Sequence, residues 1–101
     1  MAVRKLNAYG HKVVAVGNRK GMIDSTEILI EIPTKLTIDT VSLYLNPMRQ
    51  EGYVNHLISL KPKRIIFNPG TENQAFLLLA QQNGIETVQD CTLVMLSSGT
   101  F

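Results

Sequence analysis

The chain has 101 residues, one cysteine, two histidines and a formal net charge of +2, which suits a single domain spanning residues 1–101. Hydrophobic residues make up 45%, which excludes a disordered chain, and no apolar run reaches the ~20 residues of a membrane span, so no membrane partner is expected. A single cysteine excludes an internal disulfide, argues against a metal site and, with no visible signal peptide, predicts a cytoplasmic protein.

The first third of the chain predicts a helix, a strand and one ambiguous segment. A helix is expected over residues 2–9, with Gly10 as its C-terminal stop. The β-branched run over 12–16 predicts a short buried strand. Residues 22–32 stay ambiguous, because alternating isoleucines favour a strand while an Asp-Ser-Thr run favours a turn.

A strand followed by Asn-Pro and a helix occurs twice in the middle of the chain. The strands are predicted over 40–45 and 64–67, and a helix over 47–59 separates them. Asn caps helices well, and Pro is tolerated at the first helical position. Because such a helix makes a crossover connection, we expect strands 12–16, 40–45 and 64–67 to be parallel in a three-layer α/β fold.

The last third predicts one further helix and one further strand. The helix is expected over 71–83, because Thr71 and the glutamine three residues later have capping-box spacing and Gly84 follows as a stop. A short strand is expected over 85–88. The apolar run 93–96 fits either a strand or a helix.

Residues 60–73 (LKPKRIIFNPGTEN) resemble the signature of small stand-alone CoA-binding proteins, which are relatives of the CoA-binding domain of succinyl-CoA synthetase. Segments 10–18, 84–86 and 91–93 resemble the second strand and the closing segment of that family. The resemblance implies a Rossmann-like sandwich with a mostly parallel sheet, CoA as the ligand, and binding of CoA or acyl-CoA without catalysis. Family members begin with a strand and a Gly-rich loop that have no counterpart here, so the N-terminal strand is expected to be missing or replaced.

A basic tip after the second strand is the first predicted binding element. It consists of Asn18, Arg19 and Lys20. Positive charge at this position of a Rossmann-like unit suits a ribose phosphate, as in CoA or NADP. The alternative is an exposed basic turn.

The carboxyl ends of the two Asn-Pro strands are the second predicted binding element, because ligands of open α/β sheets bind at that edge. The expected residues are Asn46, Pro47, Asn68, Pro69, Gly70, Thr71 and Asn73. Gly70 allows close backbone approach, and free N–H groups at a helix start favour an anion, although Glu72 opposes it. The alternative is helix capping alone.

No catalytic residue is predicted, because no acid–base pair or activated nucleophile can be assembled from the sequence. Cys91 is interpreted as a buried structural cysteine. Two alternatives to CoA binding stay open: an NADP-type nucleotide-binding protein and a non-binding oligomerisation or scaffold unit.

Partners are expected to be a small nucleotide ligand and further copies of the chain. Nucleic acid is not expected, because the basic residues form no stripe with interleaved aromatic residues. The apolar runs 13–16 and 93–96 predict a homo-oligomer, because a small monomer would expose too much apolar surface.

Overall fold

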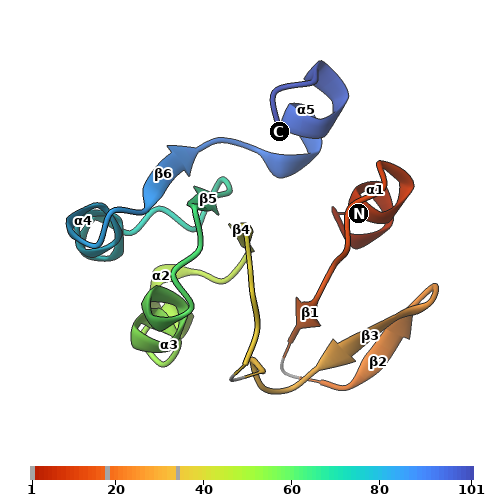
Figure 1. Ribbon diagram of the computed structural model, residues 1–101, viewed down its shortest axis with the longest axis horizontal. Helices are drawn as coiled ribbons and strands as arrows, with labels where there is room; N and C mark the ends of the chain where they lie inside the picture. Colours follow the sequence, from red (N-terminus) through yellow and green to blue (C-terminus); the bar gives the residue numbers. More distant parts are fainter. Residues whose placement is uncertain (1, 18, 34) are drawn as a thin grey trace. The chain divides into compact units, whose positions relative to one another are not determined.

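The computed structural model describes residues 2–17, 19–33 and 35–101, which fall into two compact units (Figure 1). The first unit contains the N-terminal segment up to residue 34 together with residues 93–101, and the second contains residues 35–92. Each unit is described by itself. Within the described residues, no helix has the length and apolar character needed to cross a membrane.

A parallel three-stranded sheet forms the second unit. Its strands are β4 (Thr40–Leu43), β5 (Arg64–Phe67) and β6 (Glu86–Gln89), in the order β4-β5-β6. The last three side chains of β5 are at most 1% exposed, which is typical of a central strand covered on both faces. The predicted strands and their parallel pairing are confirmed, and with them the α/β class.

Three helices provide the crossovers of the second unit. Helices α2 (Pro47–Gln50) and α3 (Val54–Ser59) connect β4 to β5, and α4 (Gln74–Gln82) connects β5 to β6. They lie on one side of the sheet in Figure 1. Phe76 of α4 packs edge-on against Phe67 of β5 with ring centroids 5.5 Å apart, so α4 is anchored directly on the central strand.

The predicted continuous helix over 47–59 is wrong, because the chain turns between α2 and α3. Gly52 lies in this turn, and glycine is a poor helix former. Gln50, the last residue of α2, is fully buried with its amide bonded to backbone carbonyls of two loops. These bonds fix the end of α2, so the chain makes a turn before α3 begins.

The expected capping box at the start of the next helix is also wrong. The N-cap of α4 is Asn73, whose side-chain oxygen accepts a hydrogen bond from the Phe76 amide at 3.2 Å. The Thr71 hydroxyl donates instead to the Asn68 carbonyl at 2.7 Å, so it closes a turn before the helix. The expected C-terminal stop is confirmed, since Gly84 has a φ of +76°.

A hairpin extended by a third strand forms the sheet of the first unit. Strands β2 (Gly21–Ile23) and β3 (Thr26–Leu29) are antiparallel, and β1 (Ala15–Val16) runs parallel to β3. The ambiguous segment 22–32 therefore contains both a turn and a strand. Asp24 in the turn has a φ of +53°, a conformation that Asp tolerates.

The predicted strand 12–16 is shorter than expected and has a different partner. We expected it to share a sheet with residues 40–45, but β1 pairs with β3 in the sheet of the first unit. The Gly17 amide extends this pairing by donating to the Leu29 carbonyl at 2.8 Å. The nearby hairpin satisfies one edge of β1 through a short connection, which costs little loop entropy.

Two helices complete the first unit. They are α1 (Ala2–Ala8) and, from Leu93 onward, α5 (Thr92–Ser98). The predicted first helix is confirmed, and Gly10 follows it with a φ of +83°. The apolar run 93–96, for which the sequence leaves strand and helix open, is helical. The Lys5 ammonium ties the helices together by donating to the Leu93 carbonyl and the Ser97 hydroxyl.

Candidate functional site

The first Asn-Pro turn lies directly after β4. Asn46 is the N-cap of α2, and its side-chain oxygen accepts a hydrogen bond from the Arg49 amide at 3.0 Å. Pro47 takes the first helical position, where its missing N–H costs nothing. Both residues are exposed. The predicted capping is confirmed, and it leaves the Pro47 ring at the surface.

The second Asn-Pro turn follows β5, and its asparagine is buried. The Asn68 amide nitrogen donates to the Leu43 carbonyl at 2.7 Å and the Ser42 hydroxyl at 3.0 Å, and its oxygen accepts from the Thr92 amide at 2.8 Å. The Thr92 hydroxyl completes the network with Ser42 at 2.7 Å. Asn68 therefore joins the carboxyl ends of β4 and β5 to Thr92 within the second unit, and it shapes the edge from inside.

Gln50 links the two Asn-Pro turns, a role that the sequence interpretation missed. Its amide nitrogen donates to the carbonyls of Leu45 and Thr71, each at 2.8 Å, and its oxygen accepts from the Asn73 amide at 3.0 Å. One signal in the sequence could have revealed this role. Gln50 is polar although it lies four residues before Val54, on a helix face that should be apolar. The two turns thus form one connected edge.

The segment after Pro69 presents a backbone donor to an acid. Gly70 has a φ of +91°, is exposed and has open space around it. Its amide donates to the Glu72 carboxylate at 2.9 Å. A carboxylate of this chain therefore occupies the position that was predicted for a ligand anion, and Glu72 must move before another anion can bind there.

The basic tip belongs to the first unit. Arg19 and Lys20 are exposed and precede β2, while Asn18 lies outside the described residues. The seven other predicted binding residues all belong to the second unit. Those seven gather along the edge where β4 and β5 end, because the register pairs Leu43 with Phe67.

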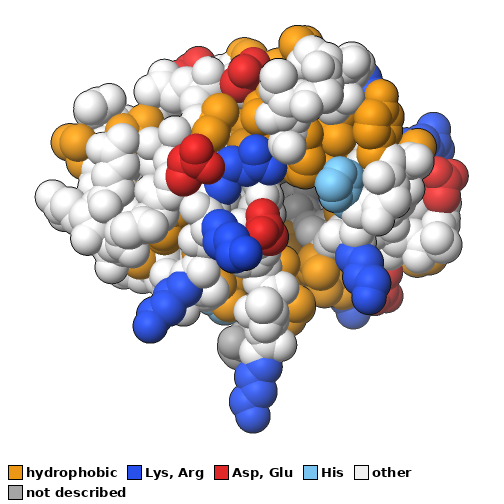
Figure 2. Space-filling view, turned by 45° about the horizontal axis from the view of Figure 1, so that its top comes forward, with side chains coloured by type: hydrophobic (Ala, Val, Ile, Leu, Met, Phe, Trp, Pro, Cys, Tyr) orange, Lys and Arg blue, Asp and Glu red, His pale blue; other side chains and the backbone are white. Residues whose placement is uncertain are grey.

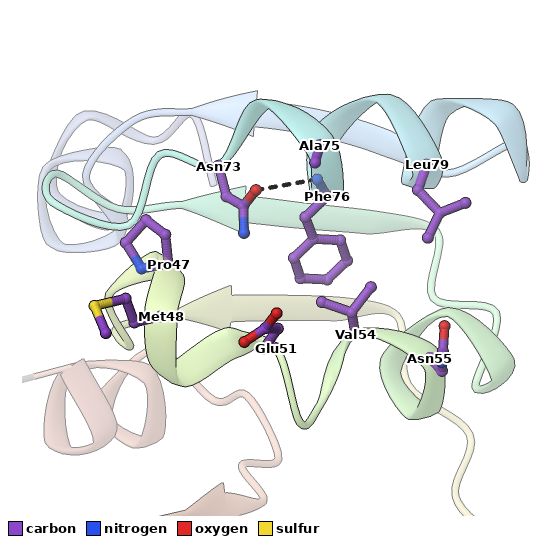
Figure 3. A pocket seen from close by; sticks show the side chains of 9 residues that line it. All are labelled: Pro47, Met48, Glu51, Val54, Asn55, Asn73, Ala75, Phe76 and Leu79. Atoms are coloured by element: carbon purple, nitrogen blue, oxygen red, sulfur yellow. Dashed lines mark hydrogen bonds between the residues drawn. The ribbon is translucent and has the colours of Figure 1, made fainter.

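A cavity of about 490 Å³ opens between α2 and α3 on one side and α4 on the other (Figure 3). Its lining residues are Pro47, Met48, Glu51, Val54, Asn55, Asn73, Ala75, Phe76 and Leu79. It starts beside the Asn-Pro edge, since Pro47 and Asn73 belong to both. The Phe76 ring points into it in Figure 3. Periodicity along the sequence does not reveal this cavity, because its walls come from helices that are separated in the sequence by β5.

The reactive side chains include Cys91, which is half-buried rather than buried as predicted. It follows the exposed Asp90, whose carboxylate accepts a hydrogen bond from the Cys91 amide at 2.7 Å. Within residues 2–17, 19–33 and 35–101, no three His, Cys, Asp or Glu side chains come together in a metal-binding arrangement.

Comparison with known proteins identifies the family. A model of the CoA binding domain matches residues 1–97. The crystal structure of an uncharacterized protein is 49% identical, with a TM-score of 0.95, covering 99% of this chain and 83% of that chain. No curated protein matches.

Two more distant structures share the fold alone. A protein from Thermus thermophilus is 18% identical, with a TM-score of 0.84, over 99% of this chain and 77% of that chain. A hypothetical protein from Pyrococcus horikoshii OT3 is 21% identical, with a TM-score of 0.82, over 95% of this chain and 69% of that chain. Because the family model spans nearly the whole sequence and the parallel sheet agrees with it, this chain belongs to the CoA-binding domain family.

Proposed function

We propose that the protein binds CoA or an acyl-CoA as one domain over residues 1–101 and does not catalyse a reaction on it. The observation that supports this most is the connected edge at the carboxyl ends of β4 and β5, in a chain that matches the CoA binding domain. Ligands of open α/β sheets bind at such edges. The hydrogen bonds of Gln50 and Asn68 hold this edge before any ligand arrives, which lowers the entropic cost of binding.

We propose different roles for the two sets of residues. Exposed Arg19 and Lys20, with Asn18, contact the ribose phosphate, which is the group that distinguishes CoA from dephospho-CoA. In the second unit, the turns at Asn46-Pro47 and Asn68-Pro69-Gly70-Thr71 and the helix cap Asn73 contact the rest of the ligand. The exposed Gly70 amide supports this assignment, because it already bonds to one anionic oxygen, that of Glu72, whose place a ligand oxygen can take once Glu72 moves away.

A ligand panel tests the proposal. Thermal unfolding is measured with CoA, acetyl-CoA, NADP and ATP at matched concentrations. A ligand at 100 times its Kd stabilises by about 2.7 kcal/mol, which corresponds to on the order of 10 °C for a domain of this size. We expect this shift with CoA and a clearly smaller one with NADP and ATP. An equal shift with NADP supports an NADP-type protein, and no shift with any ligand supports the scaffold alternative.

The proposed absence of turnover has its own measurement. Acetyl-CoA incubated with the purified protein is expected to release free thiol at the buffer rate, because no His, Lys or Arg lies near Cys91 in the sequence to activate its thiol. Release above that rate that disappears in Cys91→Ala contradicts the proposal. Cys91→Ser removes the same thiol while nearly keeping the side chain's size, so it shows whether such a loss is due to the thiol or to packing.

We also propose that the protein forms a homo-oligomer. In the first unit, Val14, Val16, Met22 and Ile30 are between 38% and 62% exposed, and hydrophobic side chains reach the surface between charged ones in Figure 2. These four residues lie on or next to the strands of one sheet, and exposed apolar side chains that form a contiguous patch mark contact surfaces. Sedimentation at micromolar concentration is expected to give at least twice the monomer mass, and Met22→Lys should reduce it, while Lys12→Met should not. A monomer at all concentrations contradicts this.

A further inference from the structure

The cavity between α2, α3 and α4 continues directly from the edge where we propose that CoA binds. Pro47 and Asn73 contribute to both. From these two residues the cavity runs along the helices to Leu79 and Asn55, as Figure 3 shows. Its volume of about 490 Å³ falls within the range of small-molecule sites, ~300–1,000 Å³. A group attached to a ligand at the edge can therefore extend into it.

The walls of the cavity are mostly apolar. Phe76 is 2% exposed and forms its floor, with Val54 and Leu79 half-buried around it. Met48 at the rim is 86% exposed, and a flexible thioether side chain can fold over an apolar ligand. A group that removes the apolar surface of these walls from water binds favourably, whereas a charged group finds few favourable contacts there.

The charge among the lining residues argues against a phosphate in the cavity. Glu51 contributes the one charged side chain among the nine, and Figure 3 shows its carboxylate between Met48 and Val54, on the side that faces Phe76. A negative carboxylate repels phosphate oxygens, and it exerts no such charge repulsion on a neutral hydrocarbon. Asn55 and Asn73 supply neutral amides only. The cavity therefore suits a neutral apolar group.

From this combination we infer that the cavity holds the acyl group of an acyl-CoA, and that the natural ligand carries an uncharged acyl chain of several carbons. This inference rests on the proposed function, since the thioester must be delivered by CoA bound at the edge. The apolar walls bind the chain, and Glu51 disfavours acyl groups that end in a carboxylate. The adenine ring is the competing occupant, and the experiment separates the two.

Dissociation constants for CoA, acetyl-CoA, butyryl-CoA and hexanoyl-CoA test the inference by calorimetry. Each methylene that enters the cavity is expected to tighten binding roughly two- to fourfold, so hexanoyl-CoA should bind at least about tenfold more tightly than acetyl-CoA. Equal affinity across the series contradicts the inference while leaving CoA binding intact. A second probe, the hexanoyl thioester of N-acetylcysteamine, lacks the nucleotide. If it binds and free CoA does not, the proposed function fails and the cavity assignment survives; if neither binds, both fail.

Two variants test whether the gain in affinity with acyl chain length arises in the cavity. Ala75→Trp places an indole at the cavity wall from an exposed position of α4, and it should remove the gain from chain length while leaving free CoA unchanged. Leu78→Trp is the matched control, because Leu78 is an exposed residue of the same helix outside the lining. If Ala75→Trp instead weakens CoA and dephospho-CoA by the same factor, with no dependence on chain length, the adenine occupies the cavity and the inference is overturned.

The role of Glu51 is tested with an acyl group that carries a terminal carboxylate. Wild type is expected to prefer butyryl-CoA over succinyl-CoA, which differs by this added charge. Glu51→Gln keeps the shape and removes the charge, so binding of succinyl-CoA should improve roughly two- to fivefold while butyryl-CoA changes little. The same improvement for both ligands, or none for either, contradicts a charge filter at Glu51.

Discussion

Replacing Asn68 by alanine is expected to lower the free energy of unfolding by roughly 2–4 kcal/mol, because buried polar groups lose their partners. The Leu43 carbonyl and the Thr92 amide both bond to the Asn68 side chain, at 2.7 and 2.8 Å. Alanine can replace neither bond, and the site is too enclosed for free hydration, since Asn68 is 2% exposed and Thr92 fully buried. The whole free energy of unfolding of a small domain is only about 5–15 kcal/mol, so the variant loses a large share of its stability.

Urea denaturation monitored by circular dichroism measures this loss. The midpoint urea concentration should fall, while the slope of the free energy of unfolding against urea concentration stays unchanged. Asn55→Ala is the matched control, because Asn55 is exposed on α3. It should change the free energy of unfolding by no more than about 0.5 kcal/mol. A variant at position 68 that is as stable as the control would show that the network at the carboxyl edge contributes little.

The second large effect concerns ligand selectivity. Replacing both Arg19 and Lys20 by alanine is expected to weaken CoA binding by roughly 10- to 100-fold, since a charge-assisted contact contributes about 1.5–3 kcal/mol. Dephospho-CoA lacks the ribose phosphate, so its affinity should change little. The ratio of the two dissociation constants, measured by calorimetry at constant salt, reports the contact directly.

A control variant that removes the same charge elsewhere distinguishes a specific contact with the phosphate from long-range electrostatic attraction. Lys61→Ala combined with Lys63→Ala also removes two positive charges, from exposed positions in the second unit. This pair should leave the CoA to dephospho-CoA ratio unchanged. If both double variants reduce CoA binding equally, only long-range attraction is involved, and the effect should then fade as salt rises. If neither does, the basic tip is an exposed turn.

Much of the second unit could be predicted because its signals are local. The run Arg64–Phe67 contains three consecutive apolar residues and is bounded by a Lys-Pro-Lys segment and by Asn-Pro, and the structure has β5 with these limits. Asn46 lies immediately before a proline, and it caps α2 as expected. In both cases propensity, capping and burial favour the same conformation. Tertiary packing therefore keeps the conformation that the local sequence prefers.

The errors occur where a side chain bonds to a different group from the one that its spacing in the sequence suggests. Thr71 has good capping-box spacing, but the carbonyl of Asn68 accepts its hydroxyl, and Asn73 caps the helix. Gln50 ends α2 early because it bonds to a loop 21 residues further along the chain. The bond of Gln50 to the Thr71 carbonyl depends on strand register and helix packing, which periodicity in a single sequence does not contain. The cavity was unpredictable for the same reason.

The buried amide of Gln50 also has a kinetic consequence. Its bonds to Leu45, Thr71 and Asn73 tie the end of α2 to the segment that starts α4, so these two helices beside the cavity cannot separate there without breaking buried hydrogen bonds. A ligand then enters between helices of fixed separation, and no helix movement slows its capture. The association rate constant should therefore be the same for short and long acyl groups. Tighter binding of a longer chain should therefore be seen as a longer residence time.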